Sequence, residues 1–282
     1  MKAHAVMDRS ERLERARGVL LITLARRGDG LTGLADLRQE GCLKVRFPRP
    51  SGWPADGVEA VMINASGGIA GGDTLGVSLC VGAGCTGSFA SQAAERFYRV
   101  VPGHPTSVLR TRVDVAAGGF AEWLPQESIV FDQAGLDRRL DISLAADARF
   151  LGVEMLVFGR LAMGESVQAA RICDTISLRR DGWLIWQDGL RFDGDVQHAL
   201  ARAAIGGGAR AMATLVYAGP DATLMLDAVR GALSPFEAGV SLLEGVLTAR
   251  ILAPDGDMLR QAVLAALALL RHGRPLPRVW AL

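Results

Sequence analysis

The feature that most constrains the fold is a recurring strand–corner–strand pattern. Short, often β-branched apolar segments bounded by Gly, Pro or Asp occur throughout residues 18–200, which is typical of strands. Three corners resemble one another: an apolar residue precedes Gly-Ala-Gly at 82–84, Ala-Ala-Gly at 116–118 and Ala-Ala-Asp at 145–147. They recur roughly every 30 residues, as in repeat proteins whose units cover each other's apolar faces. We therefore expect a mainly β fold with stacked strands in a β-helix-like array.

The C-terminal third of the chain changes to helical periodicity. Residues 220–233 carry apolar side chains at helical spacing, and Asp221 stands at the expected N-cap. A second helical pattern covers 255–273, with Asp257 as its expected N-cap and a glycine at its end. We expect two amphipathic α-helices here, separated by a strand around 244–252.

The sequence favours a single domain behind a short leader. Residues 1–17 are charged with both signs and contain no cleavable signal pattern. We expect a flexible leader there and one domain over 18–282, strand-rich in 18–219 and helix-containing in 220–282. The longest apolar runs are shorter than the roughly 18 residues that a membrane helix needs. We therefore expect a cytoplasmic protein that has no membrane partner.

Composition excludes several classes of function. The formal net charge of +1 provides no basic field for nucleic acid or for an anionic membrane surface. The four cysteines include no Cys-x-x-Cys pair, which favours reduced thiols over a disulfide or a zinc site. The four histidines are scattered along the chain, so we do not expect a tight transition-metal site built from imidazoles.

A glycine-rich stretch, Asn-Ala-Ser-Gly-Gly-Ile-Ala-Gly-Gly-Asp-Thr-Leu, occupies residues 64–75. No Gly-Lys-Ser/Thr follows, so it is not a P-loop. A strand pattern follows where a dinucleotide-binding fold would open a helix. We expect tight turns in which some of the glycines adopt positive φ. These glycines are Gly67, Gly68, Gly71 and Gly72.

Two acidic residues interrupt apolar strands. Glu154 stands within Phe-Leu-Gly-Val-Glu-Met-Leu-Val-Phe, and Asp188 separates two apolar segments. A buried ionised carboxylate needs a partner or water. Each acid therefore either pairs with an arginine, for example Arg160 or Arg191, or lines a wet internal path. Asp73, which ends the bare glycine backbone, is a possible third member of such a path.

Six segments, taken in order, resemble blocks of the urease accessory protein D family (UreD, also called UreH). They are "LADLRQEGCLKVRFPRP" (34–50), "INASGGIAGGDTL" (63–75), "SQAAERFYR" (91–99), "EWLPQESIVFDQA" (122–134), "RFLGVEMLVFGRLAMGE" (149–165) and "LPRVWAL" (276–282). The resemblance covers nearly the whole chain, and its specificity comes from the joint order and spacing of the blocks. Glu95 occupies a position where the family also accepts lysine or another polar residue.

The resemblance implies a non-enzymatic role. Family members dock on apo-urease and, with accessory proteins F and G, help deliver nickel to its dinuclear site. Protein F binds directly and protein G binds through F, and GTP hydrolysis belongs to protein G. The family fold is mainly β with a few helices. Its members hold nickel only transiently, so we expect no tightly bound cofactor.

The resemblance also gives the isolated acids a possible role. Asp73, Glu154 and Asp188 become candidates for nickel transit. Half of the residues are hydrophobic, so we also expect an exposed apolar patch that protein F covers. Two other functions remain open: a purely structural scaffold without a metal path, and a hydrolase using Asp73, Asp132 or Glu154 as an acid–base pair.

Overall fold

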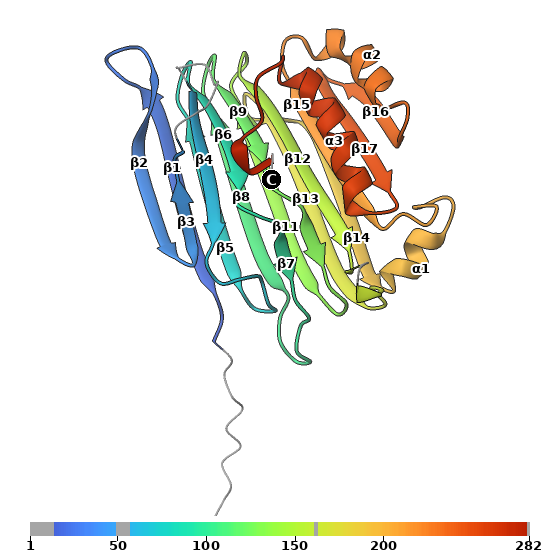
Figure 1. Ribbon diagram of the computed structural model, residues 1–282. Helices are drawn as coiled ribbons and strands as arrows, with labels where there is room; N and C mark the ends of the chain where they lie inside the picture. Colours follow the sequence, from blue (N-terminus) through green and yellow to red (C-terminus); the bar gives the residue numbers. More distant parts are fainter. Residues whose placement is uncertain (1–13, 49–56, 161–162, 281–282) are drawn as a thin grey trace, which may run out of the picture.

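The protein is a two-layer β-sandwich (Figure 1). The computed structural model describes residues 14–48, 57–160 and 163–280. The first layer, sheet A, has the strand order β14-β13-β11-β8-β5-β1-β2. Its strands are β1 (Arg17–Arg26), β2 (Thr32–Gly41), β5 (Thr74–Val81), β8 (Ser107–Val115), β11 (Gly135–Leu144), β13 (Ala170–Arg180) and β14 (Trp183–Gly194).

The second layer, sheet B, has the order β16-β17-β15-β12-β9-β6-β4-β3. Its strands are β3 (Leu43–Arg46), β4 (Gly57–Asn64), β6 (Thr86–Ser91), β9 (Phe120–Leu124), β12 (Arg149–Phe158), β15 (Ala211–Ala218), β16 (Glu237–Leu243) and β17 (Val246–Ala253). Two short strands, β7 (Glu95–Phe97) and β10 (Ser128–Val130), lie off this path, and β10 pairs in parallel with both β7 and β12.

The central strands form the stacked array that the corners predict. Three successive units, β5–β6, β8–β9 and β11–β12, each cross from sheet A to sheet B, and neighbouring units pair in parallel in both sheets. The corners stack directly: Gly84 N donates to Ala117 O at 2.8 Å, and Gly118 N donates to Asp147 Oδ1 at 2.8 Å. Both glycines have positive φ, 61° and 63°. The mainly β fold with stacked strands is therefore confirmed, and antiparallel strands flank this array on both sides.

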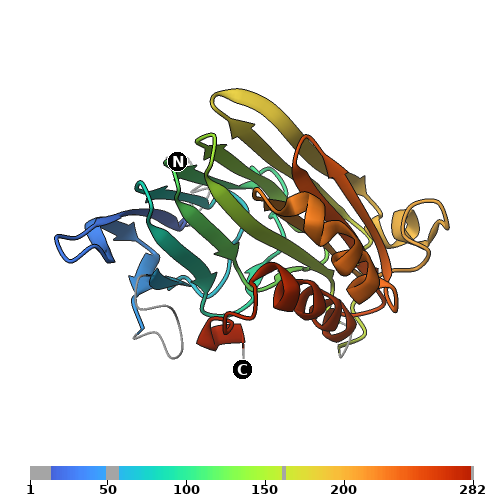
Figure 2. The same cartoon turned by 90° about the horizontal axis from the view of Figure 1, so that it is seen from above.

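Successive side chains of each strand point to opposite faces of its sheet, and buried apolar side chains form two layers. One lies between the sheets and includes Leu20, Ile22 and Leu24 of β1. The other lies on the outer face of sheet B, where α2 (Ala222–Leu233) and α3 (Gly256–Leu270) pack (Figure 2). The helices cover this face of sheet B beside the strands β15, β16 and β17.

The start of the second C-terminal helix differs from expectation. The N-cap of α3 is Asp255, whose carboxylate accepts a hydrogen bond from Met258 N at 2.8 Å. Asp257 lies in the first turn, so its assignment as the cap is wrong. Asp255 takes the role because it has the extended backbone that an N-cap requires. Asp221 does precede α2, but its side chain accepts from Tyr217 Oη at 2.5 Å and does not cap the helix.

The region between the two helices holds a hairpin rather than one strand. β16 and β17 pair antiparallel, and Glu244 and Gly245 form the turn with φ of 50° and 72°. Positive φ at both central residues is typical of a tight hairpin turn. A short additional helix, α1 (Val196–Ala201), was not expected from the sequence. It is capped by Asp195, which accepts from His198 N at 2.7 Å.

The beginning of the chain is partly outside the described residues. Of the expected leader, residues 1–13 lie outside them, and Arg17 already belongs to β1. No helix in the described ranges is long and apolar enough to cross a membrane.

Candidate functional site

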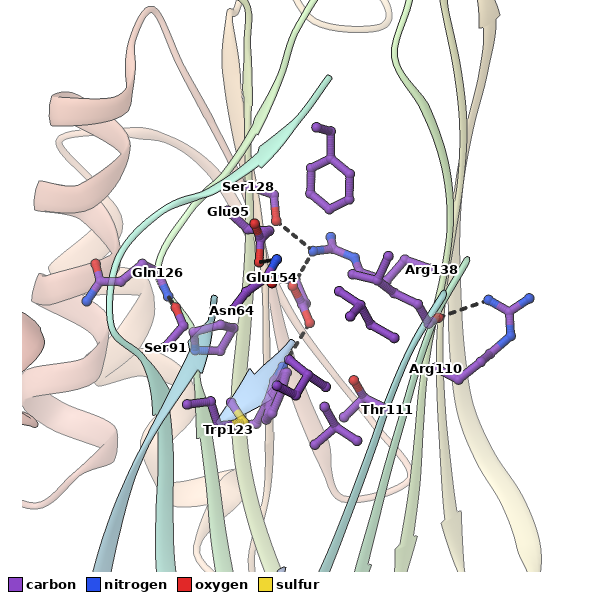
Figure 3. A pocket seen from close by; sticks show the side chains of 17 residues that line it. Asn64, Ser91, Glu95, Arg110, Thr111, Trp123, Gln126, Ser128, Arg138 and Glu154 are labelled. Atoms are coloured by element: carbon purple, nitrogen blue, oxygen red, sulfur yellow. Dashed lines mark hydrogen bonds and ion pairs between the residues drawn. The ribbon is translucent and has the colours of Figure 1, made fainter. Parts of the chain in front are cut away.

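A small cavity lies between the two sheets, beside β7 and β10 (Figure 3). Its volume is about 110 Å³. Apolar side chains form much of its wall, and polar side chains converge on one part of it. The polar residues at this part of the wall include Asn64, Glu95, Trp123, Ser128, Arg138 and Glu154.

A buried ionic cluster forms one wall of the cavity. Arg138 on β11 reaches Glu154 Oε2 on β12 with Nη1 at 2.6 Å, and Asp174 Oδ2 on β13 with Nη2 at 2.6 Å. Its Nε donates to Asp174 Oδ1 at 3.0 Å, and its Nη1 donates to Ser128 Oγ at 3.0 Å. The side chains of Arg138, Glu154 and Asp174 are 7, 7 and 9% exposed. One guanidinium thus faces two carboxylates, and the fully ionised cluster carries a net charge of −1.

The environment opposes this excess negative charge. Burial raises the pKa of Glu154, although Arg138 pulls it in the other direction. Burial also works to lower the pKa of Arg138, but Asp174 and Glu154 outweigh it and raise the pKa above its usual value. Trp123 Nε1 donates to Glu154 Oε1 at 2.8 Å, which fixes the carboxylate in place. A proton or a cation in the cavity would relieve the imbalance.

Glu95 is a second carboxylate at the same cavity. Asn64 Nδ2 donates to its Oε2 at 3.1 Å, and Arg96 N donates to its Oε1 at 3.3 Å. Within the described ranges, no basic side chain forms an ion pair with it. Burial raises the pKa of Glu95. The sequence signal that could have found this residue is the two-residue period of β7, which places Glu95 on the same face as the buried Phe97.

Asp188 lies in the same inter-sheet layer, nearer the edge of the sandwich. Its Oδ2 forms an ion pair with Arg250 of β17 and accepts from Thr214 Oγ1 of β15 at 3.5 Å. These residues line a second cavity of about 150 Å³, together with Trp186 and Ser241. Here one carboxylate faces one guanidinium, so the pair is balanced in charge.

Thr214 connects the two acidic sites. It is the register partner of Glu154 in the antiparallel pair of β12 and β15, and its hydroxyl reaches Asp188. The structure therefore places Glu154 and Asp188 on either side of one buried threonine.

Both acids have arginine partners, but not the ones suggested by the sequence. Glu154 pairs with Arg138, and Asp188 pairs with Arg250. Arg160 instead pairs with Glu165 at 2.8 Å. Arg191 of β14 is exposed and lies in register with Cys173 of β13. Its neighbours in β14, Leu190 and Phe192, pack against the core instead.

Asp73 occupies a different place. Its Oδ1 accepts from Ala16 N at 2.8 Å, and its Oδ2 accepts from Ala70 N at 2.7 Å. The carboxylate therefore ties the chain that enters β1 to the glycine-rich turn. Asp73 lines neither the cavity of Glu154 nor that of Asp188.

The glycine-rich turn has the special backbone that glycine permits. Positive φ occurs at Gly67 (78°), Gly68 (141°) and Gly72 (87°). A Cβ on Gly68 would lie 2.3 Å from Tyr98 Cε2. Gly71 lacks positive φ, but a Cβ there would lie 2.8 Å from Val100 Cγ1. Conformation and close packing together account for the glycines in this segment.

The acids considered for hydrolysis are not brought together. Asp132 Oδ1 accepts from Gln168 N and Ala169 N at 2.8 and 2.9 Å. Neither Asp132 nor Asp73 lines the cavity that contains Glu154. Among the residues that the structure describes, no group of three or more His, Cys, Asp or Glu side chains is arranged to hold a metal ion.

Comparison with known proteins places the chain in a family. The family model described as "UreD urease accessory protein" matches residues 16–281. The chain belongs to the UreD family of urease accessory proteins. It is 41% identical to the urease accessory protein UreD of Dinoroseobacter shibae, over 97% of this chain and 95% of that protein. The UreD protein of Rhizobium etli is 41% identical over 99% of this chain and 98% of its own length.

A third relative spans the whole chain. The UreD protein of Rhizobium leguminosarum bv. viciae is 40% identical and aligns over the full length of both proteins. The resemblance carried by the six sequence blocks is thereby confirmed. The names of these relatives place the family in urease maturation, and the term "accessory protein" implies a non-catalytic role.

Proposed function

We propose that this protein promotes nickel insertion into apo-urease, and that the ion passes through the inter-sheet cavity. The observation that carries this proposal is the buried cluster of Arg138, Glu154 and Asp174, whose two carboxylates share one guanidinium. A cluster that served folding alone would gain from balanced charges. A divalent cation beside Glu154 would compensate the excess negative charge.

Glu95 supplies a further carboxylate in this proposal. It faces the same cavity and has amide donors as its neighbours, so its charge is available to a cation. Two carboxylates with no imidazole or thiolate form a weak, oxygen-based site. Weak binding suits a protein that must release its cargo, so nickel is a transient passenger in this proposal rather than a resident cofactor.

The proposed path continues from Glu154 past Thr214 to Asp188. Thr214 touches Asp188 and lies in register with Glu154. Polar side chains therefore extend from Glu154 towards the edge of the layer between the two sheets. Asp188 is 27% exposed, compared with 7% for Glu154. We assign Asp188 to the outer end of the path. The bonds of Asp73 to Ala16 and Ala70 support an anchoring role for that residue instead.

The partners in this proposal are accessory protein F, bound directly, accessory protein G, bound through F, and the urease apoprotein, all in the cytoplasm. Exposed apolar side chains support a surface that a partner covers. Trp183, Leu224 and Leu243 are 79, 82 and 59% exposed. Trp183 and Leu243 flank the turns of two hairpins, and Leu224 lies in the first turn of α2.

The experiment that tests the proposal is co-expression of Glu154→Gln and Glu95→Gln variants with the urease subunits and accessory proteins. Glutamine keeps the acceptor for Trp123, and Arg138 keeps Asp174 as its partner, so the Glu154→Gln variant should fold. We expect both variants to bind their partners and to yield urease with severalfold less nickel, measured by elemental analysis. Glu40→Gln is the matched control, because Glu40 lies on the exposed strand β2.

The rival function is a purely structural scaffold without a metal path. Under that account, both variants would bind the partners and give urease its full nickel content. This result would refute the path through Glu95 and Glu154. Loss of complex formation in the variants, with normal folding of this chain, would refute it as well, because it would assign these carboxylates to docking.

A further inference from the structure

Sheet B is interrupted beside Glu154. On one side, β12 pairs with β9 over residues 149–152 and with β10 over residues 156–158. Within the part of the chain that the structure describes, residues 153–155 therefore have a register partner only in β15. Loop 125–127 joins β9 to β10, so it spans this interruption in place of a strand.

The loop forms part of the cavity wall. Pro125 and Gln126 line the cavity. Gln126 is 6% exposed, and its backbone N–H donates to Ser91 Oγ, which belongs to the same wall, at 2.8 Å. Directly after the loop, Ser128 Oγ accepts from Arg138 Nη1 at 3.0 Å. A movement of the loop would therefore open the cavity and disturb the ionic cluster inside it.

The C-terminal part of the chain holds this loop from outside. Figure 3 shows the side-chain amide of Gln126 pointing away from the cavity. Its Nε2 donates to Val279 O at 2.9 Å, and its Oε1 accepts from Arg260 Nη1 at 2.7 Å. Trp280 Nε1 donates to Leu124 O, directly before the loop, at 2.9 Å. These contacts lie on the outer face of sheet B, where α3 packs (Figure 2).

Arg260 of α3 connects the loop to the C-terminal segment, residues 274–280. Besides its bond to Gln126, its Nη2 donates to Trp280 O at 2.6 Å, and its guanidinium lies 5.0 Å from the centroid of the Trp280 ring. Trp280 is 3% exposed. A guanidinium suits this position because its planar fork can donate in two directions and stack on an aromatic ring at the same time.

We propose that loop 125–127 is a gate between the inter-sheet cavity and the outer face of sheet B, and that Arg260 is the positioning residue that keeps it closed. Release of the C-terminal segment takes Val279 O away from Gln126 and Trp280 away from Arg260. A buried amide that loses its partner is costly, so the loop moves to where water reaches it. The opening then lies beside Glu154.

The biological role of the gate rests on the proposed nickel path. Thr214 of β15, which leads to Asp188, and loop 125–127 lie on opposite sides of β12. An ion at Glu154 would therefore have one way in and another way out. A partner that takes up the C-terminal segment would control one of them.

Hydrogen exchange of the Trp123 indole N–H in the full-length protein tests the gate. This N–H donates to Glu154 Oε1 inside the cavity, so water must enter the cavity before it exchanges. Arg260→Met keeps an unbranched stem but removes two charge-assisted hydrogen bonds. We expect exchange of the Trp123 indole to become at least about tenfold faster, measured by NMR on isotope-labelled protein.

Three comparisons sharpen this measurement. The Trp280 indole reports release of the segment itself, and the backbone amides of β12 report global opening. Arg230→Met is the matched control, because Arg230 lies on α2 and donates to Val240 O rather than to the loop. Arg260→Lys keeps the charge but lacks the planar fork, so its effect should be smaller than that of Arg260→Met.

Faster exchange at Trp280 with unchanged exchange at Trp123 would overturn the gate, because the segment would then leave without opening the cavity. Unchanged exchange of both indoles in Arg260→Met would overturn it as well. The wild-type protein gives a test that needs no variant: its Trp123 indole should exchange before the amides of β12, and exchange together with them would contradict the gate.

Failure of the gate and failure of the nickel path are distinguishable. The exchange experiment contains no metal, so a closed cavity would leave transfer through Glu154 and Asp188 standing. Full nickel content of urease with Glu154→Gln would refute the transfer and would leave the exchange result unchanged.

Discussion

Replacement of Arg138 by methionine tests the electrostatic reasoning at the cavity most directly. The substitution keeps an unbranched side chain but removes the guanidinium that Glu154 and Asp174 share. Both carboxylates would remain buried without their counter-charge. Removing one partner of a buried ion pair costs about 3–5 kcal/mol, and here two carboxylates lose the same partner. We therefore expect a loss in unfolding free energy at or above this range at neutral pH.

Urea denaturation followed by far-UV circular dichroism measures this loss. With a slope of about 3 kcal/mol per molar urea, the midpoint should fall by about 1 M or more. The matched control is Arg112→Ala, which removes the exposed pair of Arg112 and Asp114 and should cost at most about 1 kcal/mol. The combined replacement Arg138→Met, Glu154→Gln and Asp174→Asn should recover much of the loss, because it leaves no unpaired charge.

The pH dependence has a definite sign. Burial already raises the pKa of Glu154, and loss of the opposing charge of Arg138 should raise it further above that of the unfolded chain. The folded state then binds protons more tightly, so the deficit of the Arg138→Met variant should shrink as pH falls. A variant that unfolds within about 1 kcal/mol of the wild type at neutral pH, or whose deficit grows on acidification, would refute the reasoning.

Two other regions give sharp expectations. Gly68→Ala should lose about 1–3 kcal/mol of stability, because the φ of Gly68 is 141° and the added Cβ would meet Tyr98. Gly67→Ala should lose less, because Gly67 has positive φ but a Cβ there would meet no neighbouring atom. Equal urea midpoints for the two variants would contradict this. Trp183→Ser should change stability by less than about 0.5 kcal/mol while reducing self-association in light scattering, because Trp183 is 79% exposed. Co-expression with accessory protein F should raise the soluble yield, and a monodisperse monomer that ignores protein F in a pull-down would argue against the partner-covered surface.

The stacked strands could be predicted because their signals are local. Apolar runs of strand length and small residues at 82–84, 116–118 and 145–147 mark where the chain turns, and the corners do stack. The helix limits were less accurate, since two aspartates, Asp255 and Asp257, both suit an N-cap and backbone conformation decides between them. The turn at Glu244 and Gly245 was missed because glutamate is not a usual residue at positive φ.

The ionic partners could not be predicted because they depend on contacts between distant strands. Arg138 stands in a run of charged residues, Asp137 to Arg139, which is typical of an exposed surface. The alternation of side chains along β11 nevertheless places Arg138 on the inward face with Leu136 and Leu140. An arginine in the apolar register of a strand is a signal that it will meet a buried acid, although which acid depends on the fold.

The two buried clusters on opposite faces of sheet B differ in how their charges balance. On the outer face, Arg271 and Arg274 both meet Glu122, and Glu59 is a second acid near Arg271. Between the sheets, one arginine meets two acids, and the neighbouring side chain Glu95 adds negative charge rather than positive. The first arrangement can be completed by side chains of the protein itself. A proton or a cation from outside would complete the second, and this difference is why we propose ion transfer through the inter-sheet face.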